Sequence, residues 1–444
     1  MLLMGCRTGP DLPRLDIAER ATWETEPRIR ATGLTPGATY TLELARVSPW
    51  NPDASELASL DYLADGRGRI DTRAQGPVEL DGEAFDALSV DDALLPYLPF
   101  QEMDYNRDPL EGVPSGRLVV TLRDGDGTEV LGRTVAMGPD RSALVEEPFG
   151  EDFPGAFLLR PASAAGPLPV VVALGGSEGD DGSARNHAPH VAERGFAVLG
   201  LPYHSPGWRG DPKFPDLPAD FAHLPIDYLE AAVAELRTRD GIDPDRVSIT
   251  GVSKGGEYVL LAASLIPDTS PGGGFCAVVA DVPSDVVWEG WGEAPEGVKE
   301  SERFAGFSWR GEGLPFVPYA NIGRGIDPND PYTLAQSHAE GRAANPDRVA
   351  PARIRVEAID EPVFAVGGDA DTVWPSGEMV RNVARTREAA GLPTQSYTYA
   401  DATHGALGDP LEAGRTADLA ARLESWPAMM AFLDRHARRR GCRG

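Results

Sequence analysis

The chain has 444 residues, of which 41% are hydrophobic and 25% charged, and its formal net charge is −28 at pH 7. This length favours two domains, each with enough apolar residues for a core of its own. Binding to a phosphate backbone requires basic patches, so the acidic balance argues against nucleic acid as a partner. The sequence has no run of eighteen apolar residues, which a membrane-spanning helix would need.

The first residues, Met1 to Cys6, lack the charged region and the longer apolar stretch of a secretory signal peptide. The segment Leu3-Met4-Gly5-Cys6 nevertheless resembles the end of a bacterial lipoprotein signal. If translation starts upstream of Met1, Cys6 would carry a lipid and the protein would be anchored in the envelope. The expected localisation is therefore cytoplasmic by default, with a lipid-anchored envelope protein as the alternative.

Residues 20–140 have the pattern of an all-β domain. Residues 39–44 alternate between polar and apolar side chains, as a half-buried strand does. Residues 117–122 form a similar run, and Arg123-Asp124-Gly125-Asp126-Gly127 after it is typical of a hairpin turn. Short strands at this spacing predict a β-sandwich. The junction with the next domain is expected near residues 137–153, where glycine and proline interrupt regular structure.

Residues 150–438 form a second region, in which strands and helices alternate. A strand at residues 168–174 leads into the loop Gly175-Gly176-Ser177-Glu178-Gly179. A phosphate cradle is one use of such a loop, but the lysine and the serine or threonine of a P-loop are missing. The alternative is that a backbone N–H, from Gly176 or Ser177, stabilises an oxyanion during acyl transfer.

The most informative motif is Gly251-Val252-Ser253-Lys254-Gly255, which fits the glycine-x-serine-x-glycine turn that presents a nucleophilic hydroxyl. The β-rich run 246–250 precedes it, and the apolar run 257–265 after it predicts a buried helix. Glycine suits positions 251 and 255 because strand and helix must approach closely around a strained serine. The motif has three fixed positions, so an ordinary Gly/Ser turn stays open until partners are found.

Aromatic residues and glycines are frequent at residues 288–313, between this helix and the next strand. Insertions at this point often form a lid, and Trp288, together with Trp374 in a later loop, is a candidate for binding the acyl group of a substrate. The alternative is that these aromatic side chains only pack against the core. His204, at the end of another strand, is expected to bond to backbone groups rather than to line a pocket.

The apolar run 362–366 has the length of a strand and leads into an acidic loop, residues 367–375. The loop has the place of the acid in a hydrolase triad, whose order is serine, acid, histidine. Asp371 is the preferred acid because of its spacing from Gly368 and the proline that closes the turn. Asp369 stays open as the rival, with a solvated or loop-capping carboxylate as its ordinary role.

The alternating run 395–399 predicts a last strand, and His404 follows it. In the expected chemistry His404 takes the proton of the Ser253 hydroxyl, and Asp371 holds the imidazole. The backbone N–H of Lys254 supplies one oxyanion donor. The sequence thus predicts an α/β hydrolase domain, a mostly parallel sheet with helices on both faces, in this second region.

The three cysteines, Cys6, Cys276 and Cys442, are far apart, with no C-x-x-C pair and no histidine at metal-ligand spacing. This pattern supports neither a disulfide framework nor a zinc site. Cys276 lies in an apolar run and is expected to pack in the core. No metal and no cofactor are expected, because acyl transfer through a serine triad needs neither.

Several of these motifs together resemble the family of acyl-CoA thioesterases and bile acid-CoA:amino acid N-acyltransferases (BAAT), over roughly residues 20–435. Gly33-Leu34-Thr35-Pro36-Gly37 is similar to the start of the family's N-terminal domain, and the serine turn extended to Glu257 is similar to that of bacterial members. Residues 359–376 resemble the family's acid loop. The resemblance implies an immunoglobulin-like sandwich before the α/β hydrolase domain, a thioester or related acyl substrate, and the triad roles given above.

The expected function is that of an acyl-CoA thioesterase, a serine hydrolase that cleaves acyl thioesters through an acyl-enzyme on Ser253, in fatty acid metabolism. The family's amidating branch typically has a cysteine nucleophile, so serine favours hydrolysis over conjugation. The alternatives are a carboxylesterase or peptidase-like hydrolase on the same scaffold, and a noncatalytic envelope binding protein. The expected partner is a small acyl thioester or ester, and the sequence identifies no partner protein.

Overall fold

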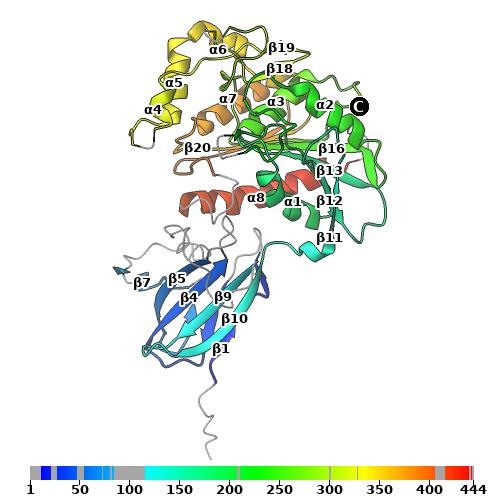
Figure 1. Ribbon diagram of the computed structural model, residues 1–444. Helices are drawn as coiled ribbons and strands as arrows, with labels where there is room; N and C mark the ends of the chain where they lie inside the picture. The colour runs from blue at the N-terminus through cyan, green and yellow to red at the C-terminus, as the bar shows by residue number, and fades with distance from the viewer. Residues whose placement is uncertain are drawn as a thin grey trace, which may run out of the picture. The chain divides into compact units, whose positions relative to one another are not determined.

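The computed structural model describes residues 12–21, 28–47, 55–72, 74–80, 83–84, 116–207, 211–299, 302–327, 329–405, 416–439 and 442. The chain divides into two compact units (Figure 1). Unit 1 comprises residues 1–139 and 410–420, and unit 2 comprises residues 140–409 and 421–444. Each unit has a hydrophobic core of its own.

Unit 1 is built from short strands. They are β1 (Arg14–Asp16), β2 (Arg20–Ala21), β3 (Arg30–Thr32), β4 (Thr39–Val47), β5 (Ser55–Leu63), β6 (Ile70–Asp71), β7 (Glu79–Leu80), β8 (Glu83–Ala84), β9 (Arg117–Arg123) and β10 (Glu129–Met137). A three-stranded sheet has the order β1-β3-β6, and a seven-stranded sheet has the order β2-β10-β9-β4-β5-β7-β8.

The two sheets of unit 1 share one core. Ala31 of β3 lies in the same buried cluster as Leu42 of β4 and Leu118 of β9, so the predicted β-sandwich is confirmed. The predicted hairpin turn is also present, because Asp124 Oδ1 accepts hydrogen bonds from the N–H groups of Asp126, at 3.0 Å, and Thr128, at 2.9 Å.

Unit 2 contains an eight-stranded sheet of order β11-β12-β14-β13-β16-β17-β20-β21. These strands are β11 (Leu144–Pro148), β12 (Phe157–Pro161), β13 (Leu168–Leu174), β14 (Ala197–Gly200), β16 (Ile242–Val252), β17 (Val278–Asp281), β20 (Val363–Gly368) and β21 (Thr394–Tyr399). The pairings of β12 with β11 and β14 are antiparallel, and the other pairings are parallel. A small separate sheet contains β15 (Leu224–Pro225), β18 (Phe307–Trp309) and β19 (Glu312–Gly313).

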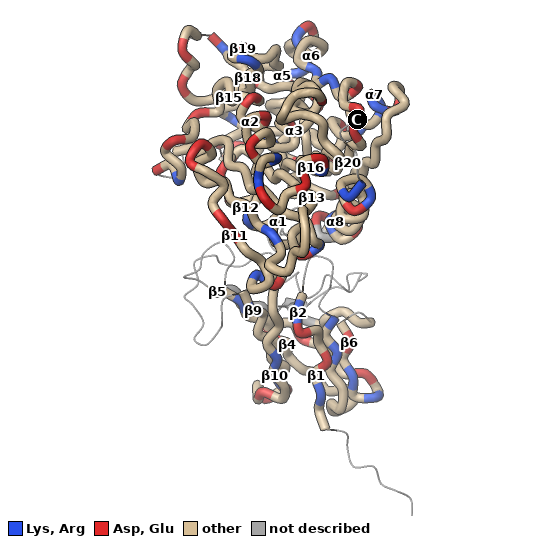
Figure 2. The backbone as a smooth tube through the Cα atoms, turned by 90° about the vertical axis from the view of Figure 1, so that its right-hand side faces the viewer, with Lys and Arg blue, Asp and Glu red and all other residues tan. Residues whose placement is uncertain are grey.

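Helices cover both faces of the large sheet. They are α1 (Gly182–Glu193), α2 (Ile226–Leu236), α3 (Lys254–Leu265), α7 (Ser376–Ala389) and α8 (Thr416–His436), with α4 (Ile322–Gly325), α5 (Leu334–Ala344) and α6 (Pro346–Ala352) in the excursion between β17 and β20. In Figures 1 and 2, α1 and α8 lie on one face of the sheet, and α2, α3 and α7 lie on the other. The strands β14, β17 and β20 are buried along their whole length, as expected for parallel strands between two helix layers. The α/β hydrolase fold predicted for this region is confirmed.

Cys276 and Cys442 form a disulfide, with their Cα atoms 4.8 Å apart. This corrects the expectation of unpaired cysteines. The two residues are 166 positions apart in sequence. Cys276 lies two residues before β17, and Cys442 lies six residues after the end of α8. Cys276 is buried, as predicted, and Cys6 lies outside the described residues.

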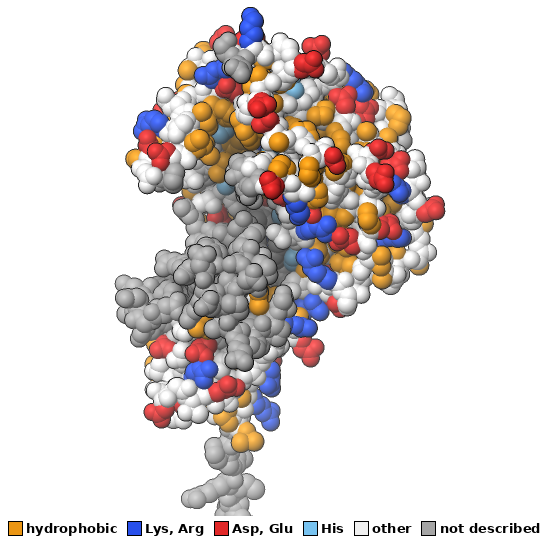
Figure 3. Space-filling view, in the orientation of Figure 1, with side chains coloured by type: hydrophobic (Ala, Val, Ile, Leu, Met, Phe, Trp, Pro, Cys, Tyr) orange, Lys and Arg blue, Asp and Glu red, His pale blue; other side chains and the backbone are white. Residues whose placement is uncertain are grey.

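Charged residues of both signs are spread along the chain of unit 2 (Figure 2), and their side chains are mixed over the visible face in Figure 3. In Figure 3, acidic and basic groups alternate on the visible face, with hydrophobic side chains between them. This arrangement fits a solvated surface. In the part of the chain that the structure describes, no helix has the length and apolar character needed to cross a membrane.

Candidate active site

Four loops that carry predicted active-site residues lie at one edge of the large sheet. The strands β13, β16, β20 and β21 run parallel, so their carboxyl ends share that edge. The loops after them carry Ser177, Ser253, Asp371 and His404, respectively. Ligands bind outside the carboxyl ends of the strands in open α/β sheets, and the topology therefore gathers the predicted residues where a site is expected.

Ser253 occupies a strained turn between β16 and α3. Its backbone has φ 57° and ψ −119°, a conformation with positive φ that residues other than glycine rarely adopt. A Cβ atom on Gly251 would lie 2.1 Å from the carbonyl oxygen of Gly255, and one on Gly255 would lie 2.1 Å from that of Gly175. Both motif glycines are therefore required by close backbone contacts, which is the physical reason that the sequence suggested.

The structure brings Ser253, His404 and Asp371 into one chain of hydrogen bonds. His404 Nε2 lies 2.8 Å from Ser253 Oγ, and His404 Nδ1 lies 2.8 Å from Asp371 Oδ2. A carboxylate accepts hydrogen bonds, so Nδ1 carries the proton and Nε2 is left to accept from the serine hydroxyl. The Asp371 side chain is fully buried, whereas the His404 side chain is 24% exposed. This geometry suits a serine nucleophile with a histidine base.

The two aspartates of the acid loop have different partners. Asp371 Oδ1 accepts hydrogen bonds from the backbone N–H groups of Val373, at 2.8 Å, and Trp374, at 3.2 Å, which fixes the carboxylate toward His404. Asp369 instead forms two hydrogen bonds with Arg381, at 2.8 and 3.1 Å, at the protein surface. The geometry therefore favours Asp371 over its rival.

Two backbone N–H groups beside Ser253 have no acceptor among the described residues: those of Ser177 and Lys254. The N–H of Gly176, the other candidate donor, is occupied by Glu178 Oε1 at 2.9 Å. A Cβ on Gly176 would lie 3.1 Å from Ser253 Cβ, so this loop passes directly beside the nucleophile. Ser177 and Lys254 are thus the better pair of oxyanion donors.

Trp288 and Trp374, expected to bind the acyl group, are 0% and 1% exposed. The indole of Trp288 donates to Ser284 Oγ at 2.8 Å, and that of Trp374 donates to the carbonyl oxygen of Val282 at 2.9 Å. Neither side chain offers a surface to a substrate in this structure, which favours core packing, and a role of either residue in binding the acyl group stays a prediction. Trp374 still bears on the site, because its ring centroid lies 5.7 Å from that of His404.

Several side chains around the triad were not expected from the sequence. Glu257, one turn after the nucleophile, pairs with the buried Lys254 side chain. His338 of α5 packs edge-on against the rings of Trp288, at 4.5 Å, and Trp374, at 5.7 Å. Burial lowers the pKa of His338 to about 3, and its neutral ring fits this apolar cluster. The lysine and glutamate three residues apart in the motif are a signal that could have indicated the ion pair.

His204 bonds to backbone, as predicted. Its Nδ1 lies 3.1 Å from the carbonyl oxygen of Ser177, and its Nε2 lies 3.1 Å from that of Ala219. The side chain is fully buried. His204 therefore ties the loop after β13 to the segment that follows β14.

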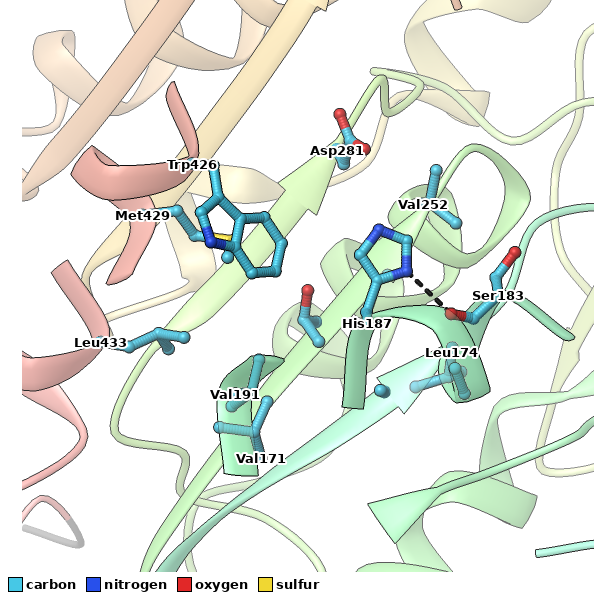
Figure 4. Close-up of a pocket in the computed structure, with 14 residues that line it drawn as sticks. Val171, Leu174, Ser183, His187, Val191, Val252, Asp281, Trp426, Met429 and Leu433 are labelled. Atoms are coloured by element: carbon cyan, nitrogen blue, oxygen red, sulfur yellow. Dashed lines mark hydrogen bonds between the residues drawn. The ribbon is translucent and has the colours of Figure 1, made fainter. Parts of the chain in front are cut away.

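A small cavity lies beneath the strand that carries the nucleophile, between α1 and α8 (Figure 4). Its volume is about 40 Å³, which has room for a few water molecules and none for a long acyl chain. Trp426, Met429 and Leu433 of α8 close one side, and His187 of α1, bonded to the Ser183 carbonyl at 2.8 Å, faces them. No triad residue lines this cavity, so it backs the nucleophile strand and is not the substrate site.

Potential metal ligands do not cluster in the described residues, where no group of three or more His, Cys, Asp or Glu side chains is arranged to hold a metal ion. That the protein needs no metal and no cofactor stays a prediction.

The chain is similar to acyl-CoA thioesterases. It is 28% identical over 256 residues to acyl-coenzyme A thioesterase 1 of Rattus norvegicus, with 57% of each chain covered. It is 26% identical over 297 residues to acyl-coenzyme A thioesterase 1 of Homo sapiens, with 65% of each chain covered. The chain thus spans between 57% and 65% of the length of these relatives. It is a distant homologue of acyl-CoA thioesterases, as the sequence motifs indicated.

Solved structures with a similar chain path include esterases. One is a fungal esterase from Rhizomucor miehei, with a TM-score of 0.43 and 15% identity over 67% of this chain and 85% of that chain. Another is an esterase from Thermogutta terrifontis, with a TM-score of 0.41 and 17% identity over 67% of this chain and 94% of that chain. No protein-family model matches the chain.

Proposed function

We propose that the protein is a serine hydrolase that cleaves acyl thioesters through an acyl-enzyme on Ser253. The observation that carries the proposal is the chain of two 2.8 Å hydrogen bonds from Ser253 Oγ through His404 to Asp371. The positive φ of Ser253 and the two N–H groups beside it, which lack an acceptor among the described residues, add support, because both are features of a nucleophile turn with an oxyanion hole.

In the proposed acylation step, Ser253 Oγ attacks the carbonyl carbon of the substrate while His404 Nε2 takes the hydroxyl proton. The carbonyl oxygen becomes an oxyanion, which accepts hydrogen bonds from the N–H groups of Ser177 and Lys254. Collapse of this intermediate breaks the bond to the leaving group, to which His404 passes its proton. The products are the free thiol and the acyl ester of Ser253.

Deacylation repeats the same steps with water. His404 takes a proton from the water molecule that attacks the acyl carbon, and then returns a proton to Ser253 Oγ as the ester bond breaks. Asp371 stabilises the imidazolium that forms in both halves of the reaction and keeps the ring in its orientation. The cycle releases a carboxylic acid and regenerates the enzyme without a cofactor.

The thioester part of the proposal is supported by the similarity to acyl-CoA thioesterases. A second candidate is a carboxylesterase with the same triad, and the net charge of −28 favours it, because coenzyme A carries phosphate groups that an acidic protein repels. A noncatalytic binding protein is the weakest candidate, since binding alone does not need a serine, a histidine and a buried carboxylate in hydrogen-bond contact.

Thiol release from acyl-CoA substrates of short to long chain, measured beside matched p-nitrophenyl esters, tests this proposal. The wild-type protein and Ser253→Ala are compared. We expect faster turnover of thioesters than of esters, lost in the variant. Ester turnover without thioester turnover would establish the carboxylesterase instead. No turnover of either substrate class would contradict the proposal.

We also propose that the protein works in an oxidising compartment. The Cys276–Cys442 disulfide supports this, because disulfides persist outside the cytosol and are rare within it. It favours the envelope over the cytoplasm among the two localisations expected from the sequence. Fractionation of the native host, followed by immunoblotting, tests the proposal, and recovery of the protein only in the cytosolic fraction would refute it.

A further inference from the structure

The glycine-rich loop after β13 is held by the two residues that follow the end of β14 closely, Tyr203 and His204. The Tyr203 hydroxyl contacts the carbonyl oxygens of Gly175, at 3.1 Å, and of Gly176. The backbone N–H of Tyr203 donates to the carbonyl oxygen of Gly179 at 2.9 Å. With the His204 contact to Ser177 described above, four carbonyl groups of one short loop face the same dipeptide.

These contacts determine where the N–H groups of the loop point. All described peptide bonds are trans, and in a trans peptide the C=O of one residue and the N–H of the next point in opposite directions. Because the Gly176 carbonyl faces the Tyr203 hydroxyl, the N–H of Ser177 points away from Tyr203. Gly176 itself lies against Ser253, since a Cβ added to this glycine would be only 3.1 Å from Ser253 Cβ. The peptide that Tyr203 holds is therefore the one that offers the second oxyanion donor.

The packing around Tyr203 fixes its hydroxyl against the Gly176 carbonyl oxygen. Its side chain is buried, and its ring packs edge-on against Tyr258, with centroids 5.0 Å apart, and against Phe221, with centroids 6.5 Å apart. Burial, together with the nearby Glu178 carboxylate, keeps the pKa of Tyr203 well above its usual value. The hydroxyl therefore stays protonated, and able to donate a hydrogen bond, near neutral pH.

We propose that Tyr203 is a positioning residue of the active site, whose hydroxyl orients the Gly176–Ser177 peptide so that the Ser177 N–H points at the oxyanion. This inference rests on the proposed function. The N–H of Gly176, the alternative oxyanion donor, already donates to the Glu178 carboxylate. The oxyanion therefore depends on the N–H of Ser177 for its second hydrogen bond, which this loop supplies. Without the Tyr203 hydroxyl the Gly176 carbonyl keeps only the hydrogen bond from the backbone N–H of Gly179, at 3.1 Å, so the peptide and its Ser177 N–H are held less firmly.

The substitution Tyr203→Phe tests this role because it removes the hydroxyl and keeps the ring. Loss of one oxyanion-hole donor lowers kcat by about 100- to 1,000-fold in a serine hydrolase. In Tyr203→Phe the Ser177 N–H is still present but is held less firmly, so the loss of kcat should be smaller. We expect kcat to fall by about 10- to 100-fold. KM is expected to change little, since the hydroxyl faces the loop and not the substrate.

Tyr258→Phe is the matched control. The Tyr258 hydroxyl is also buried and also donates to a backbone carbonyl, that of Pro225, at 2.6 Å. Its ring contacts that of Tyr203, but its hydroxyl does not touch the glycine-rich loop. Both variants therefore lose one buried hydrogen bond of the same kind, and only one of them loses it at the proposed oxyanion donor.

The experiment measures kcat and KM for p-nitrophenyl butyrate, and inhibition by an alkyl trifluoromethyl ketone, which forms an oxyanion when serine adds to it. Wild type, Ser253→Ala, Tyr203→Phe and Tyr258→Phe are compared, with thermal unfolding of each. Lower kcat and weaker ketone inhibition in Tyr203→Phe, with Tyr258→Phe unchanged, would support the inference. Equal kcat in Tyr203→Phe and wild type, or equal losses in both tyrosine variants, would overturn it. Activity that persists in Ser253→Ala would overturn the proposed function itself, and with it this inference.

Discussion

Lys254 and Glu257 form an ion pair inside unit 2, with 2.9 Å between Nζ and Oε2 and with side chains that are 5% and 0% exposed. Glu257 Oε1 also accepts a hydrogen bond from the backbone N–H of Trp288 at 3.2 Å. The ammonium lies 5.2 to 5.7 Å from the ring centroids of three aromatic residues, Phe221, Trp291 and Trp374. The pair thus connects the residue after the nucleophile to the aromatic excursion between β17 and β20.

The first prediction concerns the stability of this pair. Lys254→Met leaves a buried carboxylate without its partner and should destabilise the protein by about 3 to 5 kcal/mol. Glu257→Gln should have a comparable effect, because it leaves the ammonium buried. In the double variant neither charge remains, so the loss should be smaller than the sum of the two single losses. Urea unfolding of wild type, the two single variants and the double variant gives the interaction free energy between the two side chains. Strictly additive losses of unfolding free energy would show that the two charges do not stabilise each other.

The second prediction separates the two aspartates of the acid loop. Asp371→Asn should lower kcat by about 10,000-fold, because the amide N–H can donate to Nδ1 of His404, which leaves the ring proton on Nε2, and because an amide carries no charge to stabilise the imidazolium. Asp369→Asn removes only a surface ion pair with Arg381 and should stay within about two-fold of wild type. Both values come from the ester assay. A large loss in Asp369→Asn with an active Asp371→Asn would reverse the assignment.

The third prediction concerns pH and His338. Burial lowers its pKa to about 3 in the folded state, whereas an exposed histidine titrates near 6.5. As pH falls below about 6.5, the unfolded chain binds this proton and the folded protein does not, so stability decreases until the pH reaches about 3. The contribution of this one group is about 1.4 kcal/mol per pH unit within that window.

His338→Asn removes the titrating ring and retains a donor for the carbonyl oxygen of Leu334, which accepts from His338 Nδ1 at 2.7 Å. The variant should therefore lose less stability than wild type between pH 6.5 and pH 4. Urea unfolding at several pH values measures the difference, in which the titration of carboxylates common to both proteins cancels. Parallel stability curves would show that His338 takes up a proton in the folded state as readily as in the unfolded chain.

The fourth prediction concerns the disulfide. Cys442→Ser opens a link between residues 166 positions apart and should cost about 2 to 4 kcal/mol of unfolding free energy. Cys6→Ser leaves the link intact and is the control for loss of a cysteine. A thiol titration of the denatured, oxidised protein should detect the thiols of Cys276 and Cys442 only after reduction. Three free thiols before reduction would show that the pair does not form.

Ser253, Asp371 and His404 could be grouped from sequence because each one closely follows a strand. Ser253 had a glycine pattern, and the strands before Asp371 and His404 were clear from their apolar or alternating residues. A parallel sheet gathers such strand ends at one edge, so local patterns were enough to place distant residues together. The choice between Asp369 and Asp371 needed the coordinates, because it depends on which carboxylate the turn directs inward.

Other features depend on contacts that no local pattern reports. The Cys276–Cys442 disulfide joins residues that are 166 positions apart in sequence. The burial of Trp288 follows from its packing against Tyr319, with stacked ring centroids 5.7 Å apart. The occupation of the Gly176 N–H by Glu178 is local, but it results from a side-chain conformation that sequence does not specify.

The most direct test of the central claim is the intact mass of the protein after treatment with a fluorophosphonate, with peptide mapping of the adduct. Such probes phosphonylate a serine only when a neighbouring base activates it. The proposal predicts one adduct, located on Ser253, absent in Ser253→Ala and formed far more slowly in His404→Ala. An unmodified wild-type protein, or an adduct on another residue, would contradict the claim that Ser253 is the nucleophile.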